Sequence, residues 1–294
     1  MKRRLVQIFF ALLANASPSF LWHSGLYRGW LKGVCFPGLN CYSCPAALFA
    51  CPLGSLQQVL ASLRAIPLTA LKAGAYVLGF ILLFGFLFGR VICGWICPFG
   101  FLQELLYKIP SPKFGLPKAM RYIKLLVLFL LVLLLPWLLV DSLGQGKVWF
   151  CRLLCPAGTL EAGVFNLALR PELRSLVGQL FYWKLALLLV LIVLSVLFFR
   201  FFCVVLCPLG ALYGFFNRRG LVRLSWETSA CLQCRACENV CPLGLRLPEE
   251  LNSMECIRCL QCLKVCPING IQLIPSGSNS SEIDSPPNFT KPKT

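Results

Sequence analysis

Residues 231–242 read CLQCRACENVCP and residues 256–267 read CIRCLQCLKVCP. Both stretches have the form C-x2-C-x2-C-x3-C-P. Three thiolates at this pitch can reach the same iron–sulfur cube as the backbone turns around it, and the proline stops the turn. Four-cysteine zinc sites share the C-x2-C pairs, but zinc requires neither the third cysteine at the same pitch nor the x3-C-P ending. Two complete copies therefore favour iron–sulfur clusters over zinc.

This spacing is that of two-cluster ferredoxins, in which the fourth cysteine of each run ligates the other cluster. We therefore predict two [4Fe–4S] clusters with crossed fourth ligands. One set comprises Cys231, Cys234, Cys237 and Cys266, and the other comprises Cys256, Cys259, Cys262 and Cys241. The predicted α+β ferredoxin domain covers residues 226–274, and a tail rich in Ser, Asn and Pro (275–294) is predicted to be disordered.

The chain as a whole is strongly apolar. Of its 294 residues 58% are hydrophobic, and the mean hydropathy is +0.75, which is typical of an integral membrane protein. We expect about four membrane helices, over Leu5–Trp22, Leu68–Phe88, Ile123–Val140 and Leu185–Phe202. A single histidine, His23, cannot supply the two axial ligands of a bis-histidine haem.

The basic residues indicate how the chain sits in the membrane. The formal net charge is +17, but no basic run is interleaved with aromatic residues, so contact with the lipid bilayer is favoured over nucleic-acid binding. With the N-terminus inside, thirteen Lys and Arg residues lie on the inner side and nine on the outer. We therefore expect a multi-pass protein of a bacterial or archaeal cytoplasmic membrane, with both termini cytoplasmic. Lys184 and Arg200 fall near span ends, where their charged heads are expected to reach the interface.

Residues 1–225, the predicted membrane domain, contain an internal repeat. Cys-Pro-x-Gly begins at Cys51, Cys97, Cys155 and Cys207, and three copies carry another cysteine four residues earlier, at Cys93, Cys151 and Cys203. A proline at the first helical position places the cysteine at the helix N-terminus, where the dipole stabilises a thiolate or an anionic cluster. Buried cysteines also occur as small hydrophobic residues. Three copies at repeat spacing nevertheless favour ligands.

These cysteines predict one or two further iron–sulfur clusters. The inner site comprises Cys93, Cys97, Cys203 and Cys207. The outer site comprises Cys51, Cys151, Cys155 and Cys44, with Cys41 as the alternative to Cys44. The fourth outer ligand is ambiguous because Ala47 stands where the first repeat should have its upstream cysteine. We expect the two sites on opposite faces of a hydrocarbon core about 30 Å thick. The predicted fold is thus a mainly α membrane helix bundle, with two repeats and short amphipathic helices, followed by the ferredoxin domain.

At this point the chain resembles the NapH/NosR/MauN group of membrane-bound polyferredoxins, over roughly residues 68–270. The resemblance is carried by Cys93-Gly-Trp-Ile-Cys97-Pro98, Cys203-Val-Val-Leu-Cys207-Pro208 and the eight C-terminal cysteines. It implies electron transfer between a cytoplasmic or quinone donor and a redox partner at or beyond the membrane, such as a periplasmic reductase. The outer cysteines depart from the pattern, so a nitrate or nitrous oxide role is not implied. They suggest a chain that carries electrons further outward, for example to a separate flavoprotein.

Two other functions are compatible with cysteines on both sides of a membrane. A thiol–disulfide relay fed by the ferredoxin domain is the alternative to an electron conduit without substrate chemistry of its own. Such a relay needs one pair of cysteines per face, whereas this chain has four on one side and six on the other. Quinol oxidation at the cytoplasmic interface is a third hypothesis, but no carboxylate or histidine pair suited to proton handling stands out, and Glu161 is interpreted as a loop residue.

Overall fold

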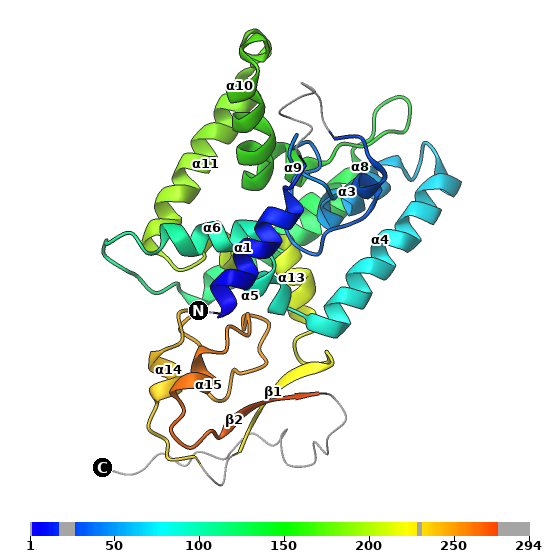
Figure 1. Cartoon of the computed structure of the whole chain (residues 1–294). Helices are drawn as coiled ribbons and strands as arrows, with labels where there is room; N and C mark the ends of the chain where they lie inside the picture. Colours follow the sequence, from blue (N-terminus) through cyan, green and yellow to red (C-terminus); the bar gives the residue numbers. More distant parts are fainter. Residues whose placement is uncertain (1, 18–26, 228–230, 276–294) are drawn as a thin grey trace.

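The computed structural model describes residues 2–17, 27–227 and 231–275. His23 and the tail over 276–294, which was predicted to be disordered, lie outside the described residues. Within them the chain is mainly helical, and a helical bundle sits on a small C-terminal cysteine region, defined here as residues 222–275 (Figure 1). The first residues of the chain lie at the same end of the bundle as this region.

Three helices in the described part are long and apolar enough to cross a membrane. They are α4 (Pro67–Phe88), a composite helix over Lys118–Leu138, and α11 (Gln179–Leu197). The composite helix comprises η2 (Lys118–Tyr122), α7 (Ile123–Val127), the π-helical stretch η3 (Leu128–Leu134) and α8 (Leu135–Leu138). The wider π turns stand directly before Pro136, which lacks an amide hydrogen and crowds the preceding turn of an α-helix.

The first predicted span, Leu5–Trp22, does not form a spanning helix within the described residues. Helix α1 (Lys2–Ala14) has 13 residues, a length of about 20 Å against a hydrocarbon core of about 30 Å. Residues 18–22 lie outside the described part. Instead of facing lipid all round, α1 packs on α5 (Val91–Trp95) and α6 (Pro98–Leu106). Gln7 Nε2 donates to the carbonyl oxygen of Gly94 over 2.9 Å.

Each Cys-Pro-x-Gly motif begins a short helix, as predicted from the proline. These helices are α3 (Pro52–Ser62), α6, a helix that starts at Pro156, and α13 (Pro208–Phe215). The helix from Pro156 continues through the π-helical η4 (Gly158–Val164) into α10 (Phe165–Leu169). The upstream cysteines lie on three five-residue helices, α5, α9 (Trp149–Leu153) and α12 (Phe201–Val205). Two short 3-10 helices, η1 (Trp30–Gly33) and η5 (Pro171–Leu176), complete the bundle.

The C-terminal cysteine region is closed by a two-stranded antiparallel sheet. Strand β1 (Val222–Trp226) pairs with β2 (Ile271–Pro275), with Leu224 opposite Leu273. Between the strands lie the short helices α14 (Ala236–Asn239) and α15 (Gln261–Val265). The region is attached to the bundle by polar contacts, among them Trp95 Nε1, which donates to the carbonyl oxygen of Arg258 over 3.0 Å. The cysteine runs are therefore held close to α5 and to the C-terminal end of α4.

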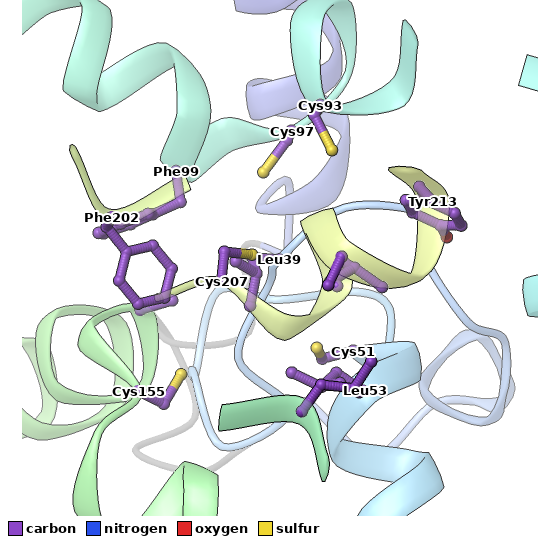
Figure 2. Packing of buried hydrophobic residues seen from close by; sticks show 14 of the residues in the cluster. Leu39, Cys51, Leu53, Cys93, Cys97, Phe99, Cys155, Phe202, Cys207 and Tyr213 are labelled. Atoms are coloured by element: carbon purple, nitrogen blue, oxygen red, sulfur yellow. The ribbon is translucent and has the colours of Figure 1, made fainter. Parts of the chain in front are cut away.

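The inner and outer cysteines share one buried core, which the sequence did not predict. Cys51, Cys93, Cys97, Cys155 and Cys207 all belong to the same cluster of buried residues. Figure 2 shows Leu39 and Cys207 between Cys93 and Cys97 on one side and Cys51 and Cys155 on the other. The expectation that the two sites lie on opposite faces of the hydrocarbon core is wrong. The short helices that follow the spans turn back into the bundle and carry their cysteines toward its centre.

Candidate iron–sulfur centres

The inner site brings together all four cysteines that the sequence assigned to it. Cys93 and Cys97 come from α5 and the start of α6, and Cys203 and Cys207 from the equivalent α12 and α13. Each side chain is no more than 7% exposed. Burial raises the pKa of the Cys207 thiol well above its usual range, and the nearby charges of Cys203, Cys93 and Cys97 raise it further. Four mutually close thiols in an apolar core are a favourable ligand set for an anionic cluster.

A glutamine from one repeat holds the upstream cysteine of the other. In the inner site Gln103 Nε2 donates to Cys203 Sγ over 3.0 Å, and Gln103 Oε1 accepts the backbone N–H of Phe202 over 3.0 Å. Gln103 itself is 1% exposed. The ring of Phe202 packs edge-on against Phe99, with ring centroids 5.3 Å apart (Figure 2). The two halves of the inner site are thereby fixed relative to one another.

The outer site repeats this arrangement with different residues. Gln57 Nε2 donates to Cys151 Sγ over 3.3 Å, and Gln57 Oε1 accepts the backbone N–H of Phe150 over 3.0 Å. Gln57 stands six residues after Cys51, as Gln103 does after Cys97. The structure therefore pairs the helix that begins after Cys51 with the Cys151–Cys155 segment. Each of the two sites thus joins a segment of the first half of the predicted repeat to a segment of the second half by the same pair of hydrogen bonds.

Of the two alternative ligands for the outer site, Cys41 is the one that lies beside its other cysteines. A Cβ atom placed on Gly158 would lie 3.7 Å from Cys155 Sγ and 3.7 Å from Cys41 Sγ. A cavity of about 720 Å³ is lined by Cys41, Cys51, Cys151 and Cys155, and also by Cys35, but not by Cys44. Cys44 packs in a small cluster with Ala46 and Ala47, and Cys41 and Phe165 pack against the edge of this cluster. The arrangement favours the alternative ligand Cys41 over our first choice, Cys44.

The glycine of Cys-Pro-x-Gly allows close contact at each cysteine. The backbone N–H groups of Gly158 and Gly210 each donate to the thiol three residues earlier, Cys155 and Cys207, over 3.4 Å. A Cβ atom on Gly100 would come within 3.0 Å of the Cys93 carbonyl oxygen, and one on Gly210 within 3.1 Å of an Arg90 nitrogen. The small residue thus leaves room for the amide to face sulfur at the positive end of the helix.

Two consecutive backbone amides connect the inner and outer sites. The Leu39 amide faces Cys97, and the Asn40 amide faces Cys51. Burial is the largest influence on both thiols and raises the pKa of Cys51 and of Cys97 to about 12. Without a metal these thiols would therefore be protonated at neutral pH. The amides act in the opposite direction and favour the anionic sulfur that binds iron.

Cations bind the carbonyl oxygens of the upstream positions in both sites, and all but the partly exposed Lys184 are buried. Arg200 donates to Cys93 O and Arg90 to Cys203 O in the inner site. In the outer site Lys184 Nζ donates to Cys151 O over 3.2 Å and Lys32 Nζ to Ala47 O over 2.7 Å. Arg200 does not reach the lipid interface as predicted, since it is 0% exposed. The common form R-x2-C-x3-C-P-x-G, at Arg90 and Arg200, was the sequence signal for this role.

A half-buried carboxylate also contacts the outer site. Glu161 lies in η4, not in a loop, and its Oε2 accepts the backbone N–H of Cys41 over 2.6 Å. Burial raises the pKa of Glu161 to about 7, while its hydrogen bond with Cys41 acts in the opposite direction. The contact holds the loop that carries Cys41 against η4.

The C-terminal cysteines line two separate cavities. One is bordered by Cys241, Cys256, Cys259 and Cys262, and the other by Cys231, Cys234, Cys237 and Cys266. In each cavity the fourth cysteine comes from the other run, which is the arrangement that crossed ligation requires. The cavity with Cys256 also contains Ile257, which is part of the bundle core, whereas Cys234 is exposed. The Cys256 cavity is therefore the one next to the inner site.

No group of three or more Cys, His, Asp or Glu residues within 2–17, 27–227 and 231–275 is close enough to bind a single metal ion. A cubane places different demands on its ligands, because each thiolate binds a different iron atom and the sulfurs stand apart at the corners. All 18 cysteines are unpaired in the structure. The four-cysteine sets are therefore compatible with cluster ligation.

Comparisons with known proteins support this chemistry. The 4Fe-4S binding domain family matches residues 49–68, 73–117 and 180–227, ranges that contain Cys51 and all four inner cysteines. Two uncharacterised proteins of Methanocaldococcus jannaschii are similar to this chain. One is 31% identical over 37% of this chain and 57% of its own length, and the other is 30% identical over 52% and 59%. The chain thus spans less than two thirds of either relative, and no solved structure matches it. The chain is an iron–sulfur protein with homologues in archaea, and its three apolar helices are compatible with a membrane protein.

Proposed function

We propose that the chain conducts electrons through a membrane along four [4Fe–4S] clusters. The clusters would be held at Cys231/Cys234/Cys237/Cys266, at Cys241/Cys256/Cys259/Cys262, at the inner site, and at Cys41/Cys51/Cys151/Cys155. The observation that carries this proposal is the pairing of Gln57 with Cys151 and of Gln103 with Cys203, which builds two equivalent cysteine sites next to one another. A bound cluster supplies one-electron redox chemistry.

The order of the four sites follows from their contacts. The exposed Cys234 belongs to the site farthest from the bundle, where a soluble donor can approach. The Cys256 site comes next, the inner site follows, and the outer site borders the large cavity. We further propose that the C-terminal region and both termini face the cytoplasm of a bacterium or archaeon. A redox protein on the far side, such as a flavoprotein, or a quinone in the bilayer would then accept the electrons, and the reverse direction of flow uses the same path.

Burial argues against the thiol–disulfide relay. A relay needs a thiolate that a partner's sulfur can reach. Cys97, Cys203 and Cys207 are 6%, 4% and 3% exposed, and the pKa of Cys97 is raised to about 12 by burial. Both properties oppose exchange with another protein and suit a ligand that stays in place.

Iron and acid-labile sulfide in the anaerobically purified full-length protein test the proposal. We expect about sixteen iron atoms per chain, four for each cubane, and absorption that bleaches on reduction. A protein with no more than about eight iron atoms would lack the two membrane clusters, and the proposed conduit would be wrong. Rapid alkylation of the inner cysteines in the iron-loaded protein would instead support the relay.

A further inference from the structure

Arg90 and Arg200 occupy equivalent places in the two repeats but connect to different partners. Each stands three residues before a cysteine of the inner site and is 0% exposed. Each also crosses to the other half of that site. Arg90 Nη2 donates to the carbonyl oxygen of Cys203 over 3.1 Å, and Arg200 Nη1 donates to that of Cys93. These two contacts with carbonyl oxygens are equivalent in the two halves of the inner site.

The second terminal nitrogen of each guanidinium group contacts a different part of the molecule. Arg200 ends within the bundle, where its Nη2 pairs with Glu104 Oε1 at 2.7 Å. Arg90 instead contacts the C-terminal cysteine region. Its Nη1 donates to the carbonyl oxygen of Met254 over 2.7 Å and to Glu255 Oε2 over 3.1 Å. These two residues directly precede Cys256, which lines the nearer C-terminal cavity. One side chain therefore touches backbone next to ligands of two different sites.

The backbone of Arg90 is tied to the same segment by a second route. Its N–H donates to Asn217 Oδ1 over 2.9 Å, and Asn217 Nδ2 donates to the carbonyl oxygens of Ser253 and Cys256 over 2.8 and 2.7 Å. Lys124 also pairs with Glu255, so this carboxylate is held by two buried cations. Hydrogen bonds to charged groups in a buried setting are stronger than neutral ones and fix geometry.

We propose that Arg90 joins the inner site to the C-terminal cysteine region and sets the rate of electron transfer between them. The inference rests on the proposed function, because it requires clusters in both places. One electron passes from the cluster at Cys256 to the cluster at Cys203, which oxidises the first and reduces the second, and no bond or proton moves. Arg90 is a positioning residue in this step. It holds the two ligand segments at a fixed separation.

The variants Arg90→Gln and Arg200→Gln in the full-length protein test this role. Both lose a contact with the inner site, but only Arg90→Gln also loses the contact with Met254 and Glu255. We expect Arg90→Gln to retain its iron and to slow reduction of the inner site roughly tenfold after rapid mixing with dithionite, equivalent to about 1.4 kcal/mol. Freeze-quenched electron paramagnetic resonance measures the order in which the clusters are reduced. Backbone amide exchange over residues 254–259 should rise in Arg90→Gln and remain low in Arg200→Gln.

Two further variants keep the result interpretable. Arg90→Lys retains the charge but lacks the fork that reaches both segments, so it should fold and still slow the transfer. Lys118→Gln removes an exposed ion pair with Glu250, a contact between the bundle and the C-terminal region away from the cysteines, and should leave the rate unchanged. Equal rates in the Arg90 and Arg200 variants would overturn the inference while leaving the conduit intact. Absence of the membrane clusters from the unaltered protein would overturn the proposed function itself.

Discussion

The inner and outer sites have the same plan but differ in how tightly they are built. In the inner site both repeats supply two cysteines, two arginines hold the upstream carbonyl oxygens, and every thiol is buried. In the outer site Ala47 replaces one cysteine, Cys41 enters from a loop, and lysines stand in place of the arginines. The outer site also borders a cavity of about 720 Å³. The difference is that the inner site is enclosed within the core, whereas the outer site borders a cavity.

Loss of one inner ligand should have the largest effect. In Cys207→Ala we expect the inner cluster to be lost, about four iron atoms per chain, and electron flow from the C-terminal region to the outer site to stop. The matched variant Cys155→Ala should lose a similar amount of iron but still pass electrons as far as the inner site. Iron analysis and spectroscopic reduction of each variant measure both outcomes. A Cys207→Ala protein that still reduces the outer site would contradict the proposed order.

Replacing the loop cysteines separately tests which of them completes the outer site. We expect Cys41→Ala to lose the outer cluster, because Cys41 lies beside Cys155. Cys44→Ala should retain full iron, because Cys44 does not line the cavity that Cys41, Cys51, Cys151 and Cys155 share. The two variants differ by three positions in one loop, so iron per chain separates them directly. The opposite result would restore Cys44 as the ligand.

The sequence predicted the kind of residue in each site better than it predicted which residues lie next to one another. Proline after cysteine correctly placed the start of α6 and α13, because its effect on the helix terminus is local. The choice between Cys41 and Cys44 depends on how a loop folds against η4, which no local pattern encodes. Arg200 was read as an interfacial residue from its place at the end of an apolar run. Its true partner, the Cys93 carbonyl, is more than a hundred residues away in sequence.

Hydropathy likewise gave three of the four predicted spans. A window of apolar residues does not reveal that α1 stops at Ala14, nor that the helices after α4 and α11 turn back into the bundle. The position of the cysteines near the centre of the bundle was therefore known only from the structure. The same turn explains why both sites share a core that the sequence separated by the whole hydrocarbon thickness.

Chelation should remove iron from the outer site before the inner one. The outer cysteines line a cavity of about 720 Å³ through which we expect water and chelator to enter, whereas the inner thiols pack in the core with Phe99 and Phe202. We expect the outer signal to decay several times faster than the inner signal during incubation with a membrane-impermeant chelator in detergent. The time course of the two signals is the measurement. Simultaneous loss would mean that the two sites are equally enclosed.

Substitution of the two glutamines should give the smallest effects, and the effects on the inner and outer sites should be similar. Gln57→Leu and Gln103→Leu each leave a buried backbone N–H, of Phe150 and Phe202, without its acceptor. Such a loss costs about 1–3 kcal/mol, so both proteins should fold with lowered thermal stability. Each variant should also lower the reduction potential of its own site only, since one N–H to sulfur hydrogen bond is removed. Redox titration of both sites in both variants checks this, and a shift at the wrong site would refute the pairing.

The consecutive amides of Leu39 and Asn40 have an electrical consequence. Neighbouring Cα atoms are about 3.8 Å apart, so the sulfurs of Cys97 and Cys51 are bridged by a very short stretch of chain. Moving one charge through the full transmembrane voltage requires about 2.3 kcal/mol per 100 mV. A hop between two sites so close together crosses only a small part of that field. In the proposed conduit, most of the work against the voltage would therefore fall on the steps before the inner site and after the outer one, and the hop between the two sites would depend little on the membrane voltage.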